Sequence, residues 1–210
     1  MAGIQEVFDL VEKGRAKKIG DAVKAAVDAG VDPSAILNEG MIAAMDSVGQ
    51  KFSAGEVFVP EMLVAARAMK KGVDTLKPYL AEGEAGANGK VIIGTVQGDL
   101  HDIGKNLVSM MLESAGFEVI DLGVDVDKNT FVSTLQDNPD TRIVCCSALL
   151  TTTMPSLKDT VDVLNQQPNR GSFKIMVGGA PITEDFAKEI GADYYSPDAA
   201  GAAQTAKAAV

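Results

Sequence analysis

The sequence has little of what metal sites and disulfides are made from. Its 210 residues include one histidine, two cysteines and no tryptophan. The cysteines, Cys145 and Cys146, are adjacent in an apolar run that predicts a strand, so their side chains should point to opposite faces and cannot easily bridge each other. A structural zinc site needs about four protein ligands, which these three residues cannot supply.

Basic residues and long apolar runs are also scarce. Nineteen basic against 29 acidic residues give a net charge of −10, which disfavours nucleic acid and anionic membranes as partners. No apolar run approaches the length of a membrane span, and residues 1–6 lack the charged and apolar segments of a signal peptide. Together with the cysteine usage, these absences predict a cytoplasmic protein.

Residues 1–80 carry apolar residues at helical spacing and show no strand pattern. Gly14 and Gly30 end the first two helices, Asp32 and Pro33 start the third, and Pro60 opens the fourth. Four helices with short connections predict a small antiparallel bundle. The small, polar and aperiodic residues 81–89 then predict a linker.

From residue 90 onward the pattern changes to alternating strands and helices. We expect strands over 91–96, 117–122, 142–149, 173–177 and 192–195, and helices near 102–115, 128–137, 155–166, 183–190 and 198–209. The strand runs are continuously apolar, as in a sheet that is buried on both faces. Residues 90–210 therefore predict a doubly wound α/β domain with a five-stranded parallel sheet.

Three loops at strand carboxyl ends carry residues suited to ligand binding, which is where α/β folds place their sites. Residues 98–106 hold the lone histidine, His101, with Asp99 before it and Asp102 after it. Residues 147–155 form a hydroxyl cluster, and Gly178-Gly179 allow a ligand to approach the backbone.

Several familiar chemistries do not fit these loops. A dinucleotide fingerprint needs a further glycine between Gly98 and Gly104, and a phosphate loop needs four residues between its glycines and Ser or Thr after the lysine, where this chain has Asn106. Ser147 does not lie in the sharp-turn motif of a hydrolase. What remains is one histidine that binds a large ligand from one side, oriented by Asp99, with any other metal ligands supplied by a cofactor.

The pattern Asp99-x-His101-x-x-Gly104, followed by Ser147-x-Leu149 and Gly178-Gly179, resembles the cobalamin-binding signature of B12-dependent methyltransferases. Residues 52–60 resemble the cap over the cofactor in methionine synthase. The whole chain is most similar to the free-standing corrinoid proteins that serve methylamine, methanol, methoxyarene and betaine methyltransferases. This resemblance implies a helical-bundle cap over 1–80, the linker, and a Rossmann-like, flavodoxin-like cobalamin domain over 90–210.

The resemblance also implies the roles of individual residues. His101 would bind cobalt as the lower axial ligand in place of the cofactor's own base, and Thr153 would stand where methionine synthase has a serine in a relay with the Asp and His. The residues expected against the cofactor are Gly98, Asp99, His101, Asp102, Ile103, Gly104, Ser147, Leu149, Thr151, Thr153, Gly178, Gly179 and Ala199, with Glu39, Phe52 and Val59 over its upper face.

Simpler structural roles stay open for several of these residues. Asp102 and one of Thr151–Thr153 could cap helices, and Gly178-Gly179 could form a plain tight turn. Phe52 and Val59 are apolar and could belong to the bundle core.

The implied function is that of a methyl carrier with cobalamin or a related corrinoid as its cofactor. A substrate-specific methyltransferase would load cobalt(I), and a second methyltransferase would unload methyl-cobalt(III) to tetrahydrofolate or coenzyme M, with a reductive activase as a further partner. Little turnover is expected from the chain alone, because no substrate pocket or general base is evident. A B12-dependent sensor or regulator, and a flavin-binding electron carrier, are the alternatives.

Overall fold

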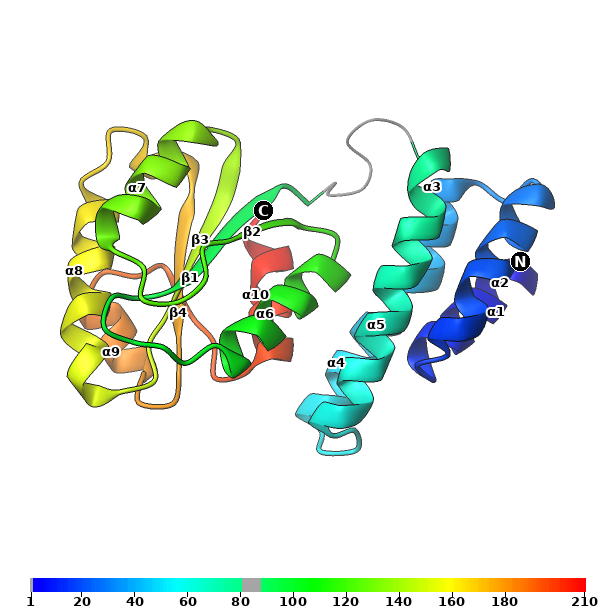
Figure 1. The fold of residues 1–210 in the computed structure, drawn as a ribbon, viewed down its shortest axis with the longest axis horizontal. Coiled ribbons are helices and arrows are strands. Elements are labelled where there is room, and N and C mark those ends of the chain that lie inside the picture. The colour runs from blue at the N-terminus through cyan, green and yellow to red at the C-terminus, as the bar shows by residue number, and fades with distance from the viewer. Residues whose placement is uncertain (1, 81–87) are drawn as a thin grey trace. The chain divides into compact units, whose positions relative to one another are not determined.

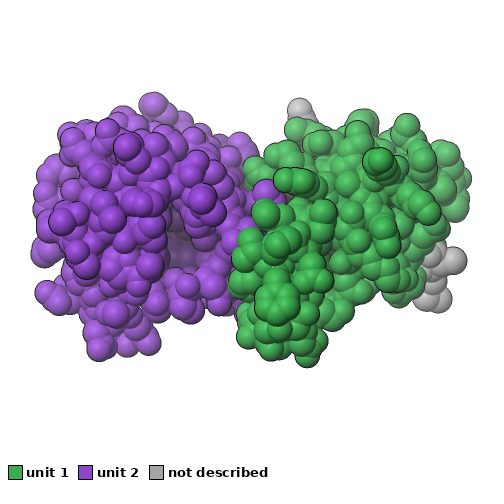
Figure 2. Space-filling model, turned by 60° about the horizontal axis from the view of Figure 1, so that its bottom comes forward, with its two compact units in different colours: residues 1–87, 113–117 green, residues 88–112, 118–210 purple. Residues whose placement is uncertain are grey.

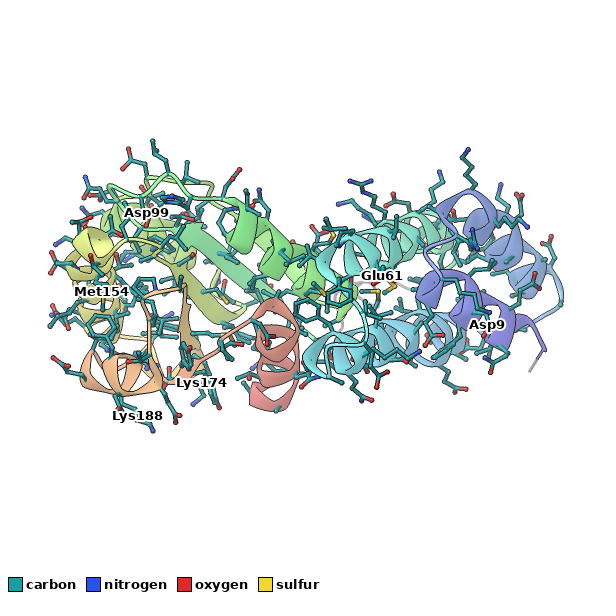
Figure 3. All side chains as sticks on the ribbon, turned by 90° about the horizontal axis from the view of Figure 1, so that it is seen from below. Asp9, Glu61, Asp99, Met154, Lys174 and Lys188 are labelled. Carbon is teal, nitrogen blue, oxygen red and sulfur yellow. The ribbon has the colours of Figure 1, made fainter. Side chains whose placement is uncertain are left out.

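The computed structural model describes residues 2–80 and 88–210, so most of the linker expected over 81–89 lies outside the described residues. The chain divides into two compact units, residues 1–87 with 113–117 and residues 88–112 with 118–210 (Figure 2). Figure 3 draws the side chains of both, with Asp9 and Glu61 on the helical unit and Asp99 on the sheet unit. Within the described ranges, no helix is long and apolar enough to cross a membrane.

The first unit is helical, as the apolar spacing predicts (Figure 1). Its elements are α1 (Ala2–Glu12), α2 (Ala16–Asp28), α3 (Pro33–Ala35), the π-helical segment η1 (Ile36–Ile42), α4 (Ala43–Ser53), α5 (Val59–Leu76) and the 3-10 turn η2 (Lys77–Tyr79). From α3 to α4 the chain stays helical without a break, so the expected third helix is one rod that contains a π-helical stretch. A π-helical stretch is uncommon, and apolar spacing alone does not reveal it.

Local sequence explains where these helices begin. The Asp32 carboxylate accepts a hydrogen bond from Ala35 N–H at 3.1 Å, and Pro33 occupies the first helical position. At the start of α5, the Glu61 side chain accepts from Phe58 N–H at 2.9 Å. The apolar stripes then meet in a core that contains Val7, Val11, Ile19, Val23, Ile36, Met41, Met62, Met69 and Leu76, all fully buried.

The second unit is the expected parallel sheet, with strands in the order β2-β1-β3-β4-β5. The strands are β1 (Lys90–Thr95), β2 (Glu118–Asp121), β3 (Thr141–Ser147), β4 (Lys174–Gly178) and β5 (Tyr194–Tyr195). The helices are α6 (Ile103–Ser114), α7 (Lys128–Asp137), α8 (Met154–Asn165), α9 (Glu184–Glu189) and α10 (Ala199–Ala209), with 3-10 turns η3 (Thr151–Thr153) and η4 (Arg170–Ser172). This strand order is that of flavodoxin-like folds.

Helices cover both faces of the sheet, α7, α8 and α9 on one and α6 and α10 on the other (Figure 1). The first face packs a core that includes Ile92, Val144, Ile175, Phe131 and Leu157. Cys146 belongs to this core and its neighbour Cys145 does not, in keeping with the alternation of side chains along a strand. Both thiols are free and buried.

Candidate functional site

The expected loops meet at one edge of the sheet, because the strands that precede them are neighbours. Thr95 at the end of β1 pairs with Ser147 at the end of β3, and Ser147 pairs with Gly178 at the end of β4. Since all strands are parallel, their carboxyl ends and the following loops lie at the same edge. The fold thus brings together segments up to 80 residues apart in sequence, from Gly98 to Gly178.

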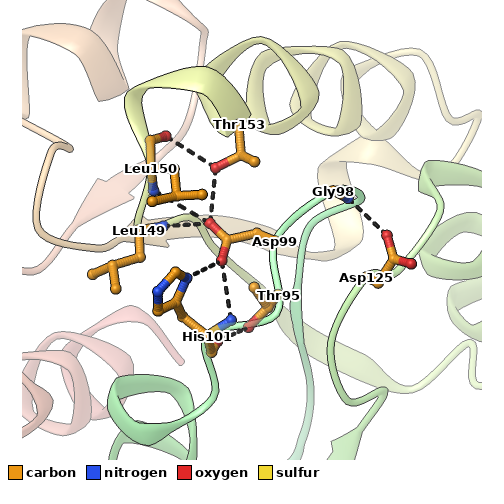
Figure 4. A network of polar contacts seen from close by, with 8 residues as sticks. All are labelled: Thr95, Gly98, Asp99, His101, Asp125, Leu149, Leu150 and Thr153. Atoms are coloured by element: carbon orange, nitrogen blue, oxygen red, sulfur yellow. Dashed lines mark hydrogen bonds and ion pairs between the residues drawn. The ribbon is translucent and has the colours of Figure 1, made fainter.

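The centre of this edge is the carboxylate of Asp99, which is fully buried (Figure 4). Its Oδ2 accepts hydrogen bonds from the backbone N–H of Leu149 at 2.7 Å and of Leu150 at 3.3 Å. Its Oδ1 accepts from the backbone N–H of His101 at 3.1 Å and lies 2.7 Å from Nδ1 of the same residue. A buried carboxylate needs such donors, since leaving it unpaired is costly.

These donors decide the charge of Asp99. Burial alone raises the pKa of the Asp99 carboxyl, but the Leu149 N–H, the imidazole and backbone N–H of His101, and the Thr153 hydroxyl together hold it well below its usual range. Asp99 is therefore an anion at neutral pH, and an ionised carboxylate only accepts hydrogen bonds.

The ionised Asp99 in turn fixes the tautomer of His101. Because the carboxylate can only accept, Nδ1 of the ring must carry the proton in the 2.7 Å hydrogen bond. The lone pair of the neutral ring is then on Nε2, to which none of the described residues donates. The side chain is 49% exposed, so Nε2 is available to a ligand from outside the chain.

Thr153 completes the contacts of Asp99. Its Oγ1 lies 2.8 Å from Asp99 Oδ2 and 2.9 Å from the carbonyl oxygen of Leu150. Both partners are acceptors and the hydroxyl has one proton, and the charged carboxylate is the stronger acceptor of the two. The hydroxyl expected from the sequence is thus in contact with Asp99, despite the restricted χ1 of threonine.

The paired glycines lie beside the third strand. Gly179 has a φ of +134°, and a Cβ atom there would come within 1.8 Å of the Ala148 carbonyl oxygen, so only glycine fits. A Cβ at Gly178 would lie 3.1 Å from the Ser196 carbonyl oxygen. The two glycines therefore let the strand ends approach each other closely, and they leave backbone rather than side chains at this part of the edge.

Several exposed apolar side chains belong to the histidine loop and to the segment that binds Asp99. Leu100 is 71% exposed and Ile103 is 84% exposed, and Leu149 and Leu150 are also exposed. Gly104 is the second residue of α6, and a Cβ atom there would meet nothing within 4 Å. Large apolar residues that are exposed close together are typical of a binding surface.

The other residues expected at this edge lie around it without joining the contacts of Asp99. Gly98 has a φ of +85° in the histidine loop, and the Asp102 carboxylate accepts from the Asn106 amide at 3.2 Å. Thr151 is exposed at the start of η3. Ala199 is buried as the first residue of α10, whose N-terminus is capped by Asp198.

The three residues expected over the upper face of a cofactor lie in the helical unit. Glu39 is exposed within η1, Phe52 is half-buried in α4, and Val59 is 40% exposed as the first residue of α5. Phe58, which precedes Val59, is 66% exposed. Val59 and Phe58 are therefore surface residues rather than core residues of this unit.

Sequence reasoning missed two residues that hold the histidine loop. The Thr95 hydroxyl donates to the His101 carbonyl oxygen at 2.9 Å. The Asp125 carboxylate accepts from Gly98 N–H at 2.7 Å (Figure 4). Thr95 could have been suspected as a hydroxyl at a strand end, whereas nothing in the sequence marks Asp125, because its contact depends on strand order and on its backbone conformation.

The donor set fits a metal that brings most of its own ligands. No group of three or more His, Cys, Asp or Glu side chains that could hold a metal ion occurs among the described residues. One oriented imidazole beside an apolar surface suits a single axial bond to a macrocyclic metal complex, such as a corrinoid.

Comparison with known protein families and structures supports this interpretation. Residues 89–204 match one family model described as a B12 binding domain, and residues 4–77 match a second model with the same description. The dimethylamine corrinoid protein 1 of Methanosarcina acetivorans is 45% identical over 192 residues, which are 89% of each chain.

Two solved structures are also similar along the whole chain. A cobalamin-binding protein from Desulfitobacterium hafniense DCB-2 is 32% identical with a TM-score of 0.81, covering 99% of this chain and 98% of its own. A chain of the methanol:cobalamin methyltransferase complex MtaBC from Methanosarcina barkeri is 28% identical with a TM-score of 0.86, covering 99% of this chain and 79% of its own. Both its sequence and its fold show that this chain belongs to the family of B12-binding corrinoid proteins.

Proposed function

We propose that the protein is a methyl carrier, which holds cobalamin or a related corrinoid through His101. A substrate-specific methyltransferase loads the carrier, and a second methyltransferase unloads it to tetrahydrofolate or coenzyme M. The observation that supports this most is the buried Asp99 carboxylate, which fixes the proton on Nδ1 of His101 and leaves the lone pair on Nε2 of a side chain that is 49% exposed. When bound, the corrinoid supplies the cobalt that accepts and gives up the methyl group.

The chain's own contribution is to hold and orient one imidazole. Asp99 retains the Nδ1 proton and makes the ring more basic, as a carboxylate does for a metal-binding histidine. Thr153 and the backbone N–H groups of Leu149 and Leu150 keep Asp99 ionised and fixed. The Asp–His pair can also take up or release a proton as the bond from Nε2 to its ligand forms or breaks.

The remaining residues of the sheet edge would bind the rest of the cofactor. We assign Ser147, Leu149 and Thr151 to the slot for the displaced tail, and Gly178 and Gly179 to the backbone surface for its nucleotide end. Gly98, Asp102, Ile103, Gly104 and Ala199 complete this binding surface. Support comes from their common position at the carboxyl ends of neighbouring strands, where ligands bind in such sheets.

The helical unit would shield the methyl group. We assign this role to Glu39, Phe52 and Val59, and the exposure of Val59 and Phe58 supports it, because apolar side chains at a surface are available to cover a ligand. The similarity to a chain of a methanol:cobalamin methyltransferase complex supports a methyltransferase partner. A reductive activase belongs to the same proposal as a further partner.

A His101→Gly variant tests the proposal. The variant and the wild type are reconstituted with hydroxocobalamin, and their absorption spectra are compared before and after imidazole is added. We expect a different spectrum for the variant and a return toward the wild-type spectrum with imidazole, which replaces the missing nitrogen ligand. An unchanged spectrum in the variant would show that His101 does not bind cobalt.

Methyl transfer identifies the donor and acceptor. The reconstituted, reduced wild-type protein is mixed with candidate methyltransferases for methylamines or methanol, and methylation is followed by the change in the cobalt spectrum. The methylated protein is then offered tetrahydrofolate or coenzyme M with the matching second enzyme. If no such pair loads or unloads the bound corrinoid, the carrier function is wrong.

A further inference from the structure

We propose that Asp125 is a positioning residue for His101, because it holds the backbone of the histidine loop at Gly98 and Asp99. The inference rests on the proposed role of His101 as the axial ligand. It assigns to Asp125 no contact with the cofactor, only the placement of Asp99, and through Asp99 the placement of the imidazole.

The backbone of Asp125 has an unusual, left-handed conformation. Its φ is +54°, and it is the one non-glycine residue with a positive φ in the described part of the chain. The left-handed region is unfavourable for residues with a Cβ atom, although aspartate tolerates it better than most. Such a conformation persists only where surrounding contacts enforce it, and it is typical of functional sites.

In this conformation Asp125 makes two hydrogen bonds to the histidine loop. The Asp125 carboxylate accepts from Gly98 N–H at 2.7 Å, and Asp125 N–H donates to the Asp99 carbonyl oxygen at 2.9 Å (Figure 4). One residue thus binds two consecutive residues of the histidine loop, with its side chain and its backbone at once. A hydrogen bond from a backbone N–H to a charged carboxylate is among the stronger ones.

The segment that carries Asp125 is itself fixed to the sheet. Thr95 N–H donates to the Gly123 carbonyl oxygen at 3.0 Å, and Val126 N–H donates to the Thr95 carbonyl oxygen at 3.0 Å. Asp125 therefore extends from a rigid frame at the end of β1. The same loop is also held through the Asp99 carboxylate, which accepts hydrogen bonds from Leu149, Leu150 and Thr153.

The carboxylate of Asp99 can direct the imidazole only if the Asp99 backbone is in place. The 2.7 Å bond to Nδ1 and the 2.7 Å bond to Leu149 N–H have to form together, which fixes the position of Asp99 from both ends. Without the Asp125 contacts, we expect the loop to sample positions in which Asp99 keeps its donors on the 149–153 side and loses Nδ1. The imidazole would then carry its proton on either nitrogen, and a protonated Nε2 cannot bind a metal.

The simpler explanation is that Asp125 only stabilises the start of α7. The structure offers a matched control for it in Asp127, two residues further on. The Asp127 carboxylate accepts from Asn129 N–H at 2.8 Å and caps α7, and it makes no hydrogen bond to residues 98–101 among the described residues. Asp127→Gly thus removes a carboxylate from the same segment and leaves the histidine loop bound.

The lone histidine allows a direct test in the cofactor-free protein. The full chain is labelled with ¹⁵N, any histidine tag is removed, and the two ring nitrogens of His101 are observed by NMR at alkaline pH, where their chemical shifts report the tautomer. The variants are Asp125→Gly, which keeps the left-handed backbone but removes the carboxylate, and Asp125→Asn, which keeps an oxygen acceptor and tolerates the same φ.

For the wild type, for Asp125→Asn and for Asp127→Gly we expect one tautomer with the proton on Nδ1. For Asp125→Gly we expect a mixture of tautomers and roughly tenfold weaker binding of hydroxocobalamin, the size of effect that one lost charged hydrogen bond produces. The melting temperature of each cofactor-free variant shows whether it is folded, and a folded Asp127→Gly with a lower melting temperature separates stability from positioning.

A single Nδ1–H tautomer in folded Asp125→Gly would overturn this inference. The same mixture of tautomers in Asp125→Gly and in Asp127→Gly would also overturn it. If Asp125→Gly does not fold, the inference is tested by the Asp125→Asn variant instead. A wild-type tautomer and cofactor affinity in Asp125→Asn support the inference, and a mixture of tautomers overturns it. Failure of the His101→Gly test would instead overturn the axial-ligand role and leave the tautomer result unaffected, so the two proposals fail separately.

Discussion

Two glycines at the sheet edge are needed for different reasons. At Gly179, a side chain would collide with the Ala148 carbonyl oxygen at 1.8 Å, so the protein itself excludes any other residue. At Gly104, in the first turn of α6, a Cβ atom would meet nothing within 4 Å. The chain alone gives no reason for glycine at position 104, whereas a ligand that lies against this turn beside His101 does.

Gly104→Ala is therefore expected to leave the cofactor-free protein folded and slightly more stable, by up to about 1 kcal/mol, because alanine favours helix more than glycine does. Its affinity for hydroxocobalamin should fall about tenfold, since the added methyl group enters the space of the ligand. Chemical denaturation measures the first effect and a spectroscopic binding titration the second.

Gly179→Ala is the matched control for this prediction. It should destabilise the cofactor-free protein by more than about 3 kcal/mol, because the backbone of residue 148 has to move and the left-handed φ is strained. A Gly104→Ala variant that binds the corrinoid as tightly as the wild type would show that the open space beside His101 is not part of the site.

Sequence could predict some of these residue contacts and not others. Asp99 and His101 are two residues apart in a loop, so their contact is local and their spacing indicates it. The contact between Thr153 and Asp99 spans 54 residues and was expected only from the resemblance to a family. The contact of Asp125 with Gly98 spans 27 residues and needs a left-handed backbone, for which an aspartate between two valines gives no signal.

At the scale of elements, one partly exposed ion pair ties α1 to α4. The Glu12 carboxylate accepts from Lys51 Nζ at 2.7 Å and from the Ser47 hydroxyl at 2.7 Å. The hydrogen bond from Lys51, followed by that from Ser47, holds the pKa of Glu12 below its usual range, against the smaller opposing effect of burial. A carboxyl with a lowered pKa in the folded state stabilises that state when it is ionised.

This pair predicts an acid-dependent loss of stability in the helical unit. The contribution of Glu12 is present above its unfolded pKa, near 4.5, and is lost as the pH falls through the lower folded pKa. Glu12→Gln should therefore destabilise the unit by about 1 kcal/mol at neutral pH and progressively less below pH 4.5. Chemical denaturation of both proteins between pH 7 and pH 3 measures this, and a difference independent of pH would contradict it.

Elements were predicted well where one local signal defines them. Asp32 and Pro33 mark a helix start, and the continuously apolar runs mark β1, β3 and β4. The π-helical stretch η1 was not foreseen, because a widened turn still presents Ile36, Leu37 and Met41 to the core. A linear pattern of apolar residues therefore does not distinguish a π-helical turn from an α-helical one.

At the scale of the whole molecule, each unit buries its own apolar side chains. Ile19 in α2 and Ile175 in β4 are both fully buried, one in each unit. Two separate cores can unfold in separate steps, because the loss of one does not require the loss of the other.

We therefore expect two unfolding transitions in the cofactor-free protein. Ile19→Ala should lower the free energy of unfolding of the helical unit by about 2–5 kcal/mol and leave that of the sheet unit unchanged. Ile175→Ala should do the reverse, since each substitution leaves a cavity in one core. Differential scanning calorimetry of the three proteins measures both transitions. A single transition that both substitutions lower equally would show that the two units fold as one.

The overall architecture followed from the change of pattern at residue 90, from helical spacing to alternating strands and helices. The parallel sheet and its position after the helices were predicted correctly. The strand order β2-β1-β3-β4-β5 could not be read from alternation alone, because several orders satisfy the same right-handed connections. That order sets which strand ends are neighbours, and hence which distant residues share the site.

The two buried cysteines of β3 bear on the methyl-carrier role proposed above. Burial raises the pKa of the Cys145 thiol to about 12 and raises that of Cys146 well above its ordinary value. Sulfur attacks alkylating agents as the thiolate, so both side chains should react slowly with an alkyl donor while the chain is folded. A methyl carrier with these thiols would not alkylate itself, and iodoacetamide should label both positions only after denaturation.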